Sequence, residues 1–237
     1  MSVEQNIADI QRKIAAGANK AARNPDDIAL MAVTKTCSPE AIREAYEAGL
    51  RLFGENRVQE FAGKVNQLAG LNGAEWHMIG HLQTNKAAKT AELFSAVDSV
   101  DSVRLAERLN QAASQTSKKL KVLIEVNVGG EAAKTGVGLD SQELWHLLES
   151  APQWPQLQIQ GLMTVPPFTD DPEDARPYFR RLRELRDQVA ARKLPAVSMD
   201  VLSMGMSHDF EIAIEEGSTC VRLGTVIFGA RPQPQKT

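Results

Sequence analysis

The sequence predicts an α/β fold, a single (β/α)8 TIM-type barrel with an extra helix at its N-terminus. Three observations favour it: short β-rich runs alternate with longer helical patterns, the runs number eight, and several are apolar almost throughout. Alternating strands and helices form parallel sheets with right-handed crossovers, and parallel strands buried on both faces read as apolar runs. A doubly wound open sheet is the alternative, but the count of eight and the lack of a glycine fingerprint after the first run favour the barrel.

The chain begins with a predicted amphipathic helix. Val3, Ile7, Ile10 and Ile14 recur at helical spacing with charged residues between them. This pattern is typical of a packing helix and not of a signal peptide. No stretch of the chain reaches the roughly 20 apolar residues that a membrane span needs. We therefore expect a soluble, cytoplasmic protein.

The remaining elements alternate along the chain. The predicted strands are 28–36, 50–56, 75–80, 94–100, 120–128, 157–165, 199–207 and 219–229. The predicted helices between them are 38–49, 83–94, 102–115, 141–150, 173–193 and 208–217. Ser38 as N-cap and Pro39 in the first turn give the first of these helices a clear start. We expect residues 1–237 to form one domain, with 166–174 as a turn-rich surface loop or lid and 231–237 as a frayed tail.

Composition excludes several functions. The formal net charge is only −3, so neither nucleic acid nor an anionic membrane is the expected partner. Cys37 and Cys220 lack metal spacing, and two thiols in a chain of this length are expected to be reduced. His77 and His81 have no suitably spaced carboxylate or cysteine nearby, and we expect no metal site.

Lys35 lies near the end of the first predicted strand. Period-two alternation puts Met31, Val33 and Lys35 on one face. If that face is the barrel interior, burial lowers the pKa of the lysine and frees its lone pair. Such an amine can form a Schiff base with a carbonyl. The alternative is a strand-end lysine that reaches solvent or pairs with a carboxylate such as Glu55.

Two segments near the C-terminus suit a phosphate. Gly205 permits a tight turn, and Ser207 is the predicted N-cap of the helix that follows. Gly224 and Thr225 lie on the eighth run, and the loops after strands seven and eight are the recurrent phosphate site of such barrels. The alternative is an ordinary capped helix and a glycine that packing requires.

Arg222 lies between apolar neighbours in the last run and points into the barrel mouth if those neighbours pack outward. A buried guanidinium needs a partner. That partner is either a strand carboxylate such as Glu125 or an acceptor atom of a ligand. A strand-one lysine, a phosphate loop and an inward arginine together describe a ligand with an aldehyde, a ring heteroatom and a phosphate. Pyridoxal 5′-phosphate has all three groups.

The sequence resembles a known family, the pyridoxal phosphate homeostasis proteins (YggS/PROSC-type). The matching motifs span nearly the whole chain: AVTKT (32–36), FGENRVQE (53–60), WHMIGHLQTNK (76–86), GLMTV (161–165), LSMGMSHDFEIAIEEGST (202–219) and VRLGTVIFGAR (221–231). The resemblance implies a single barrel of the alanine racemase N-terminal type, pyridoxal phosphate fold type III, that binds the cofactor.

The resemblance also implies which residues contact the cofactor. They are Lys35, Asn56, His77, Ile79, Met206, Ser207, Arg222, Gly224 and Thr225. Lys35 would form the aldimine and Arg222 would face the pyridine nitrogen. Ser207, Gly224 and Thr225 would hold the phosphate, and the other members would lie around the ring or shape the phosphate loop.

Two positions depart from the family pattern beside the expected site. Position 81 is His where the family usually has Pro, and position 208 is His where an acidic or small polar residue is common. Both leave the cofactor expectation unchanged and affect the local chemistry of the pocket.

The resemblance implies a role in cofactor homeostasis: reversible binding, buffering or delivery of pyridoxal phosphate, transient contact with apo enzymes, and an effect on amino-acid and keto-acid metabolism. Related racemases use a tyrosine from a second domain as second base. Here the chain ends soon after the eighth run, and Tyr46 and Tyr178 fall in predicted outer helices. An arginine at the ring nitrogen also weakens the ring as an electron sink.

We therefore expect a monomeric carrier and not an enzyme. One alternative is a monomeric pyridoxal phosphate-dependent racemase or lyase that uses His77, His81 or water as its second base. The other is a barrel that binds a different phosphorylated ligand.

Overall fold

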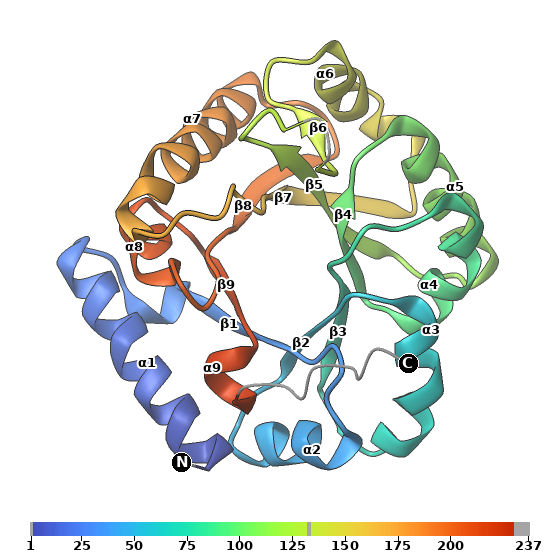
Figure 1. Ribbon diagram of the computed structural model, residues 1–237. Helices are drawn as coiled ribbons and strands as arrows, with labels where there is room; N and C mark the ends of the chain where they lie inside the picture. The colour runs from blue at the N-terminus through green and yellow to red at the C-terminus, as the bar shows by residue number, and fades with distance from the viewer. Residues whose placement is uncertain (1, 132–133, 230–237) are drawn as a thin grey trace.

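The computed structural model describes residues 2–131 and 134–229, and its centre is a closed barrel of eight parallel strands (Figure 1). The strands are β1 (Ala29–Val33), β2 (Leu52–Glu55), β3 (Glu75–Met78), β4 (Ala96–Val100), β5 (Leu120–Asn127), β7 (Leu157–Met163), β8 (Val197–Ser203) and β9 (Cys220–Leu223). Each strand pairs with the next in this order, and pairing of β9 with β1 closes the ring. The predicted (β/α)8 barrel is confirmed.

Helices surround the strands as an outer ring (Figure 1). They are α1 (Val3–Lys20), α2 (Pro39–Glu47), α3 (Val58–Lys64), α4 (Ala87–Leu93), α5 (Val103–Gln115), α6 (Gln142–Glu149), α7 (Arg176–Arg192), α8 (Phe210–Glu215) and α9 (Thr225–Phe228). Helix α1 is the predicted extra helix, and its Ser2 and Gln5 form a capping box. The predicted start of α2 is also confirmed, because the Ser38 side chain accepts the backbone N–H of Ala41.

The strands predicted over 28–36 and 199–207 end early, at Val33 and Ser203, and three further elements differ from the sequence prediction. Helix α3 was not predicted, and neither was the two-residue strand β6 (Val137–Gly138), which pairs with β5 outside the barrel. The last predicted strand is wrong beyond Leu223, because residues 225–228 form α9. Ile227 of α9 is fully buried, and its carbonyl accepts a hydrogen bond from the Asn6 side chain. Tertiary packing here overrides the strand propensity of a Thr-Val-Ile-Phe run.

Aromatic packing fixes α3 against the barrel wall. Phe61 of α3 lies between Trp76 of β3 and Phe94, with ring centroids 4.8 and 4.9 Å away. Trp76 in turn stacks on Phe53 of β2 at 4.8 Å. Such offset aromatic pairs add to the stability of area burial. These contacts therefore hold α3 in a fixed position against the barrel wall.

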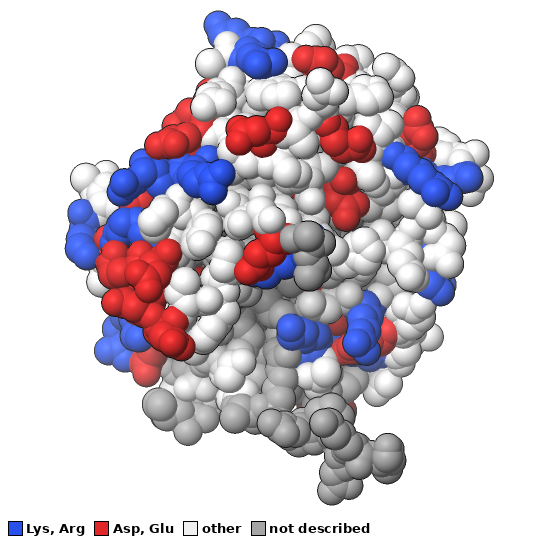
Figure 2. Space-filling model, turned by 45° about the horizontal axis from the view of Figure 1, so that its top comes forward, with Lys and Arg blue, Asp and Glu red and all other residues white. Residues whose placement is uncertain are grey.

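Ion pairs join α7 to the end of α8. Glu216, almost fully buried, pairs with Arg176, Arg180 and Arg183 of α7 at 3.0 to 3.1 Å. Figure 2 shows acidic and basic atoms side by side over this part of the surface. The network restrains α8, which follows the loop after β8. The sequence predicted a phosphate site in that loop.

Two expectations concern the chain as a whole. Within the described ranges, none of the helices combines the length and apolar character that crossing a membrane requires. The predicted frayed tail, 231–237, lies outside the described residues, and the single-domain organisation stays a prediction.

Candidate functional site

The described part of the barrel interior holds two cavities, one at each end of the strands. One lies at the carboxyl ends, with a volume of about 350 Å³. The other, of about 260 Å³, is lined by the first residues of several strands, among them Ala29, Glu75, Ala96 and Cys220. We call them the carboxyl-end cavity and the amino-end cavity. In barrels of this kind the carboxyl end carries function and the amino end stability.

The carboxyl-end cavity brings together most of the predicted site. Its lining residues are Val33, Lys35, Asn56, Ile79, Val165, Met206, Ser207, His208, Arg222, Gly224 and Thr225. All of the residues expected to contact the cofactor are among them, with the single exception of His77. They come from five strand ends that are far apart in the sequence, and only closure of the barrel places them around one space.

Lys35 lies two residues after the end of β1, in a turn. The backbone N–H of Cys37 donates to the carbonyl of Thr34 at 3.0 Å and closes this turn. The Lys35 side chain is partly buried and lines the cavity beside Val33, as period-two alternation predicted. Glu55, a partner that the sequence left open for Lys35, instead pairs with Lys64 at 2.8 Å.

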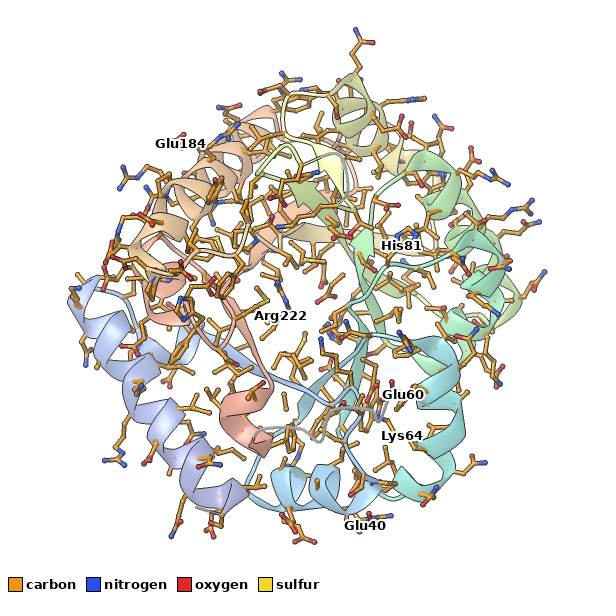
Figure 3. The ribbon with its side chains drawn as sticks, in the orientation of Figure 1. Glu40, Glu60, Lys64, His81, Glu184 and Arg222 are labelled. Atoms are coloured by element: carbon orange, nitrogen blue, oxygen red, sulfur yellow. The ribbon has the colours of Figure 1, made fainter. Side chains whose placement is uncertain are left out.

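Arg222 enters the cavity from β9 and is only 4% exposed. Figure 3 shows it within the ring of strands. Its guanidinium donates to Ser203 Oγ and to the carbonyl of Thr164, each at 2.7 Å. These partners are neutral oxygens, whereas the carboxylate of Glu125 accepts from the Thr135 hydroxyl at 2.7 Å. The strand-carboxylate alternative with Glu125 is therefore wrong.

Burial lowers the pKa of the Arg222 guanidinium from its ordinary value, and nearby carboxylates such as Asp98 and Asp209 oppose that effect. A guanidinium has donors only and no acceptor. Arg222 therefore presents N–H groups, and a ligand atom that faces it must be an acceptor.

The loop after β8 corrects one prediction. Ser207 is not the N-cap of α8, because that position belongs to Asp209, two residues later. Asp209 Oδ1 accepts the backbone N–H of Met206 at 2.6 Å, and this bond folds the loop back on itself. Within the described residues, the Ser207 hydroxyl has no hydrogen-bond partner, and it lines the cavity. The backbone N–H groups of Asp209 and Phe210, which a serine cap would accept, donate instead to the carbonyl of Met206.

Gly205 makes the turn of this loop possible. Its φ is +96°, and a Cβ there would come within 2.6 Å of the Ala213 side chain. Glycine is thus required both by its backbone and by the close approach of α8. The tight turn predicted at this residue is confirmed.

Gly224 and Thr225 join β9 to α9. Gly224 occupies the N-cap position and Thr225 is the first residue of the helix. Among residues that the structure describes, the Thr225 hydroxyl has no hydrogen-bond partner. Two unpaired hydroxyls, from Ser207 and Thr225, therefore line the same cavity.

Asn56 comes directly after β2 and brings an unpaired acceptor. Its Oδ1 atom is buried and lacks a hydrogen-bond partner in the described structure. The backbone of Asn56 passes so close to Gly80 that a Cβ there would come within 2.4 Å of the Asn56 carbonyl oxygen. The close approach fixes Asn56 at the cavity wall, where a ligand can meet its side chain.

His77 lies in the amino-end cavity, away from the other predicted contacts. Its Nδ1 is 3.0 Å from Asp98 Oδ1, and its Nε2, 3.9 Å from Glu75 Oε2, has no hydrogen bond in the described structure. Burial alone would lower its pKa, but Asp98 and Glu75 outweigh burial and raise the pKa of His77 to about 9. Ile79, two residues later on the same face of the chain, lines the carboxyl-end cavity. Two residues of strand span about 7 Å, which explains why the predicted pair divides between the cavities.

The two histidines that depart from the family pattern have different places. His81 is half exposed, 3.5 Å from Asp101, and is not a lining residue. His208 lines the carboxyl-end cavity and stacks on Phe168, with centroids 5.6 Å apart. Phe168 is 80% exposed and belongs to the loop predicted as a lid.

Sequence reasoning did not assign Val33, Val165 or His208 as contacts. Val33 was placed on the correct face, and Val165 ends one of the matching motifs. The available signals were that Val33 shares a face with Lys35, and that Val165 and His208 directly follow Thr164 and Ser207.

The chain is similar to known proteins over almost its whole length. The family model described as "Alanine racemase, N-terminal domain" matches residues 5–232. The pyridoxal phosphate homeostasis protein of Aquifex aeolicus is 44% identical over 231 residues, covering 98% of this chain and 99% of the relative. The protein of the same name from Escherichia coli K12 is 41% identical over 236 residues and 99% of both chains.

Solved structures show the same similarity. PipY of Synechococcus elongatus, solved with pyridoxal phosphate bound, superposes with a TM-score of 0.83 at 34% identity, covering 96% of this chain and all of PipY. The alanine racemase of Streptomyces coelicolor gives a TM-score of 0.72 at 18% identity, over 97% of this chain and 58% of the racemase. The second likeness is one of fold alone.

Proposed function

The chain belongs to the pyridoxal phosphate homeostasis protein family, whose barrel matches the alanine racemase N-terminal domain, and on this premise we propose that it binds pyridoxal 5′-phosphate reversibly in the carboxyl-end cavity. One observation carries the proposal: an amine, a guanidinium and two unpaired hydroxyls surround one cavity of about 350 Å³. That volume lies in the usual range of small-molecule sites. The protein would buffer or deliver the cofactor in the cytoplasm and so affect amino-acid and keto-acid metabolism.

The residues present fit the cofactor. When bound, pyridoxal phosphate supplies an aldehyde that bonds reversibly to a primary amine and a conjugated ring that can accept electrons. Lys35 provides the amine. The hydroxyls of Ser207 and Thr225 can donate to phosphate oxygens, and the small Gly224 between strand and helix lets the phosphate approach the backbone. The otherwise unpaired Oδ1 of Asn56 could accept a hydrogen bond from the ligand.

Arg222 supports binding over catalysis. Its guanidinium is held by Ser203 and Thr164 and offers donors only. If the ring nitrogen faces it, that nitrogen accepts a hydrogen bond and stays unprotonated. An unprotonated ring is a weaker electron sink, and the environment that Arg222 creates therefore disfavours carbanion chemistry.

The distribution of proton-transfer groups supports the same conclusion. The hydroxyl of Tyr46 donates to the carbonyl of Asn72, outside the barrel, and Tyr178 lies on α7. Neither tyrosine lines the cavity, and neither do His77 and His81. We propose a monomeric carrier that contacts apo enzymes transiently. The alternative, a racemase or lyase, rests on His208, which is at the cavity and could act as a base.

Covalent capture tests the binding site. Purified protein mixed with pyridoxal phosphate should turn yellow, and borohydride reduction should remove the colour and fix the cofactor on Lys35. Peptide mass spectrometry locates the adduct. Lys35→Ala should abolish it, whereas Lys89→Ala, which changes a lysine on the outer helix α4, should leave it intact. An adduct on another residue, or none, contradicts the proposal.

Turnover tests the carrier role. The loaded protein is incubated with a panel of amino acids while products are followed by chiral chromatography. We expect no sustained turnover and expect transfer of the cofactor to an added apo enzyme. Steady turnover that disappears in both Lys35→Ala and His208→Ala would instead establish the racemase or lyase.

A further inference from the structure

The turn that carries Lys35 has an uncommon backbone. Thr36 has a φ of +60°, and within 2–131 and 134–229 it is the only β-branched residue with positive φ. The bond from Cys37 N–H to the Thr34 carbonyl makes Lys35 and Thr36 the two central residues of a turn whose second central position is left-handed. Glycine is usual there, because side chains crowd the backbone. Such strain persists only where the surroundings hold it.

Glu60 of α3 holds one side of this turn. The backbone N–H of Thr36 donates to Glu60 Oε1. The same oxygen is 3.3 Å from Lys64 Nζ, one helical turn further along α3. A bond to a charged acceptor is stronger than a neutral one. The carboxylate therefore fixes the amide of a residue that is otherwise exposed to solvent.

Lys64 holds the other side of the turn. Its Nζ donates to the carbonyl of Thr34 at 2.9 Å and pairs with Glu55 Oε1 at 2.8 Å. With Glu60 these acceptors match the three N–H groups of an ammonium. Only 9% of the Lys64 side chain is exposed. Figure 3 shows Glu60 and Lys64 together on α3.

The neighbours of Lys35 on both sides are thus tied to one buried ammonium. Thr34 is fully buried, and its hydroxyl donates to Glu55. The attraction within a buried ion pair often does not exceed the cost of desolvating its two charges. Apolar residues of the same volume often stabilise a fold equally well. Preorganisation of a reactive group is a role that apolar residues could not fill, because it requires directed bonds to the backbone.

We propose that Glu60 and Lys64 are positioning residues that hold the left-handed turn and so direct the amine of Lys35 into the carboxyl-end cavity. This inference rests on the proposed function, because Lys35 is the amine that would take up the cofactor. Neither residue lines the cavity. Both act through the backbone on either side of Lys35.

Glu60 provides the sharper test, because its side chain is 26% exposed and its variants should fold. Glu60→Ala removes the acceptor of the Thr36 amide, and Glu60→Gln keeps it. Glu184→Ala, an exposed glutamate on α7, is the matched control (Figure 3). We expect amide exchange at Thr36 to accelerate at least about tenfold and pyridoxal phosphate affinity to fall about tenfold in Glu60→Ala. Glu60→Gln, which keeps a neutral acceptor, should lose clearly less affinity than Glu60→Ala, and Glu184→Ala should stay within about twofold of wild type.

Rescue separates positioning from general destabilisation. Glycine adopts φ of +60° without strain, and alanine does not. In the Glu60→Ala background, Thr36→Gly should therefore restore most of the lost affinity, whereas Thr36→Ala should restore none. Loss of thermal stability in Glu60→Ala with unchanged affinity, or equal effects of Thr36→Gly and Thr36→Ala, would overturn the inference. If wild-type protein binds no cofactor, the proposed function is wrong, and exchange at Thr36 alone then decides whether Glu60 holds the turn.

Discussion

At the amino ends of the strands, charged side chains around the barrel interior pair with one another: His77 lies 3.0 Å from Asp98, and Lys121 lies 2.9 Å from Glu75. At the carboxyl ends, the polar groups of Ser207, Thr225 and Asn56 have no partner among the described residues. Buried polar groups are normally satisfied. The buried pair of Asp98 with His77 therefore serves the fold, and the buried, unpaired Oδ1 of Asn56 supports the proposal that the carboxyl-end cavity takes up a ligand.

Removal of Asp98 should give the largest loss of stability. Asp98→Ala removes the carboxylate that keeps the proton on buried His77, and loss of this pair should cost about 3 kcal/mol of unfolding free energy. Urea denaturation at pH 7 measures this loss. Cofactor affinity should change less than about threefold, because neither residue lines the carboxyl-end cavity. If Asp98→Ala lowered affinity more than stability, the amino end of the barrel would serve binding and not only the fold.

The pH dependence of stability should report the same pair. The pKa of His77 is raised from 6.5 to about 9 in the folded chain. Its contribution is therefore fully present below pH 6.5 and is lost as the pH rises through 9. The shift corresponds to about 3 kcal/mol. Urea midpoints between pH 6 and pH 10 should fall in wild type, and the part due to this group should be absent in His77→Gln. Identical slopes in the two proteins would contradict the assignment.

The unpaired hydroxyls at the carboxyl end should show the opposite behaviour. Ser207→Ala and Thr225→Ala should each weaken pyridoxal phosphate binding about tenfold, because each removes a donor to a charged oxygen. Unfolding free energy should change by less than about 0.5 kcal/mol, since neither hydroxyl is bonded within the described chain. Absorbance titration and urea melts measure the two effects, with Ser114→Ala on the outer helix α5 as control. If either variant lost stability but kept its affinity, the two hydroxyls would serve the fold and not the ligand.

The smallest effect is expected at the rim of the amino-end cavity. Lys121 and Glu75 are each more than 40% exposed. Such surface pairs contribute about 0 to 1 kcal/mol and are screened by salt. Lys121→Ala should therefore lower unfolding free energy by less than about 0.5 kcal/mol, and the difference should vanish at 1 M salt. A loss that persists at high salt would mean that the rim, too, is part of the structural core.

Much of the architecture followed from local pattern. Apolar runs of strand length located all eight barrel strands, and Ser38 with Pro39 located the start of α2. Helix α3 was not predicted because it has neither a side-chain cap nor a long periodic stretch. Its stability comes from Phe61, which packs on Trp76 and Phe94. Residues 225–228 read as strand because their β propensity is local, whereas the burial of Ile227 that makes them helical is not.

The sequence by itself determined which residue types could serve a site: a lysine at the end of β1, an inward arginine on β9, and serine and threonine in the last two loops. These follow from alternation and from strand ends, which are local properties. Only the tertiary structure decided three features: the depth of each side chain along the barrel, the bond of Asp209 to the Met206 amide, and the contacts of Glu60 and Lys64 with the turn at Lys35. Each depends on atoms brought together from separate elements, and periodicity in one segment carries no information about such distances.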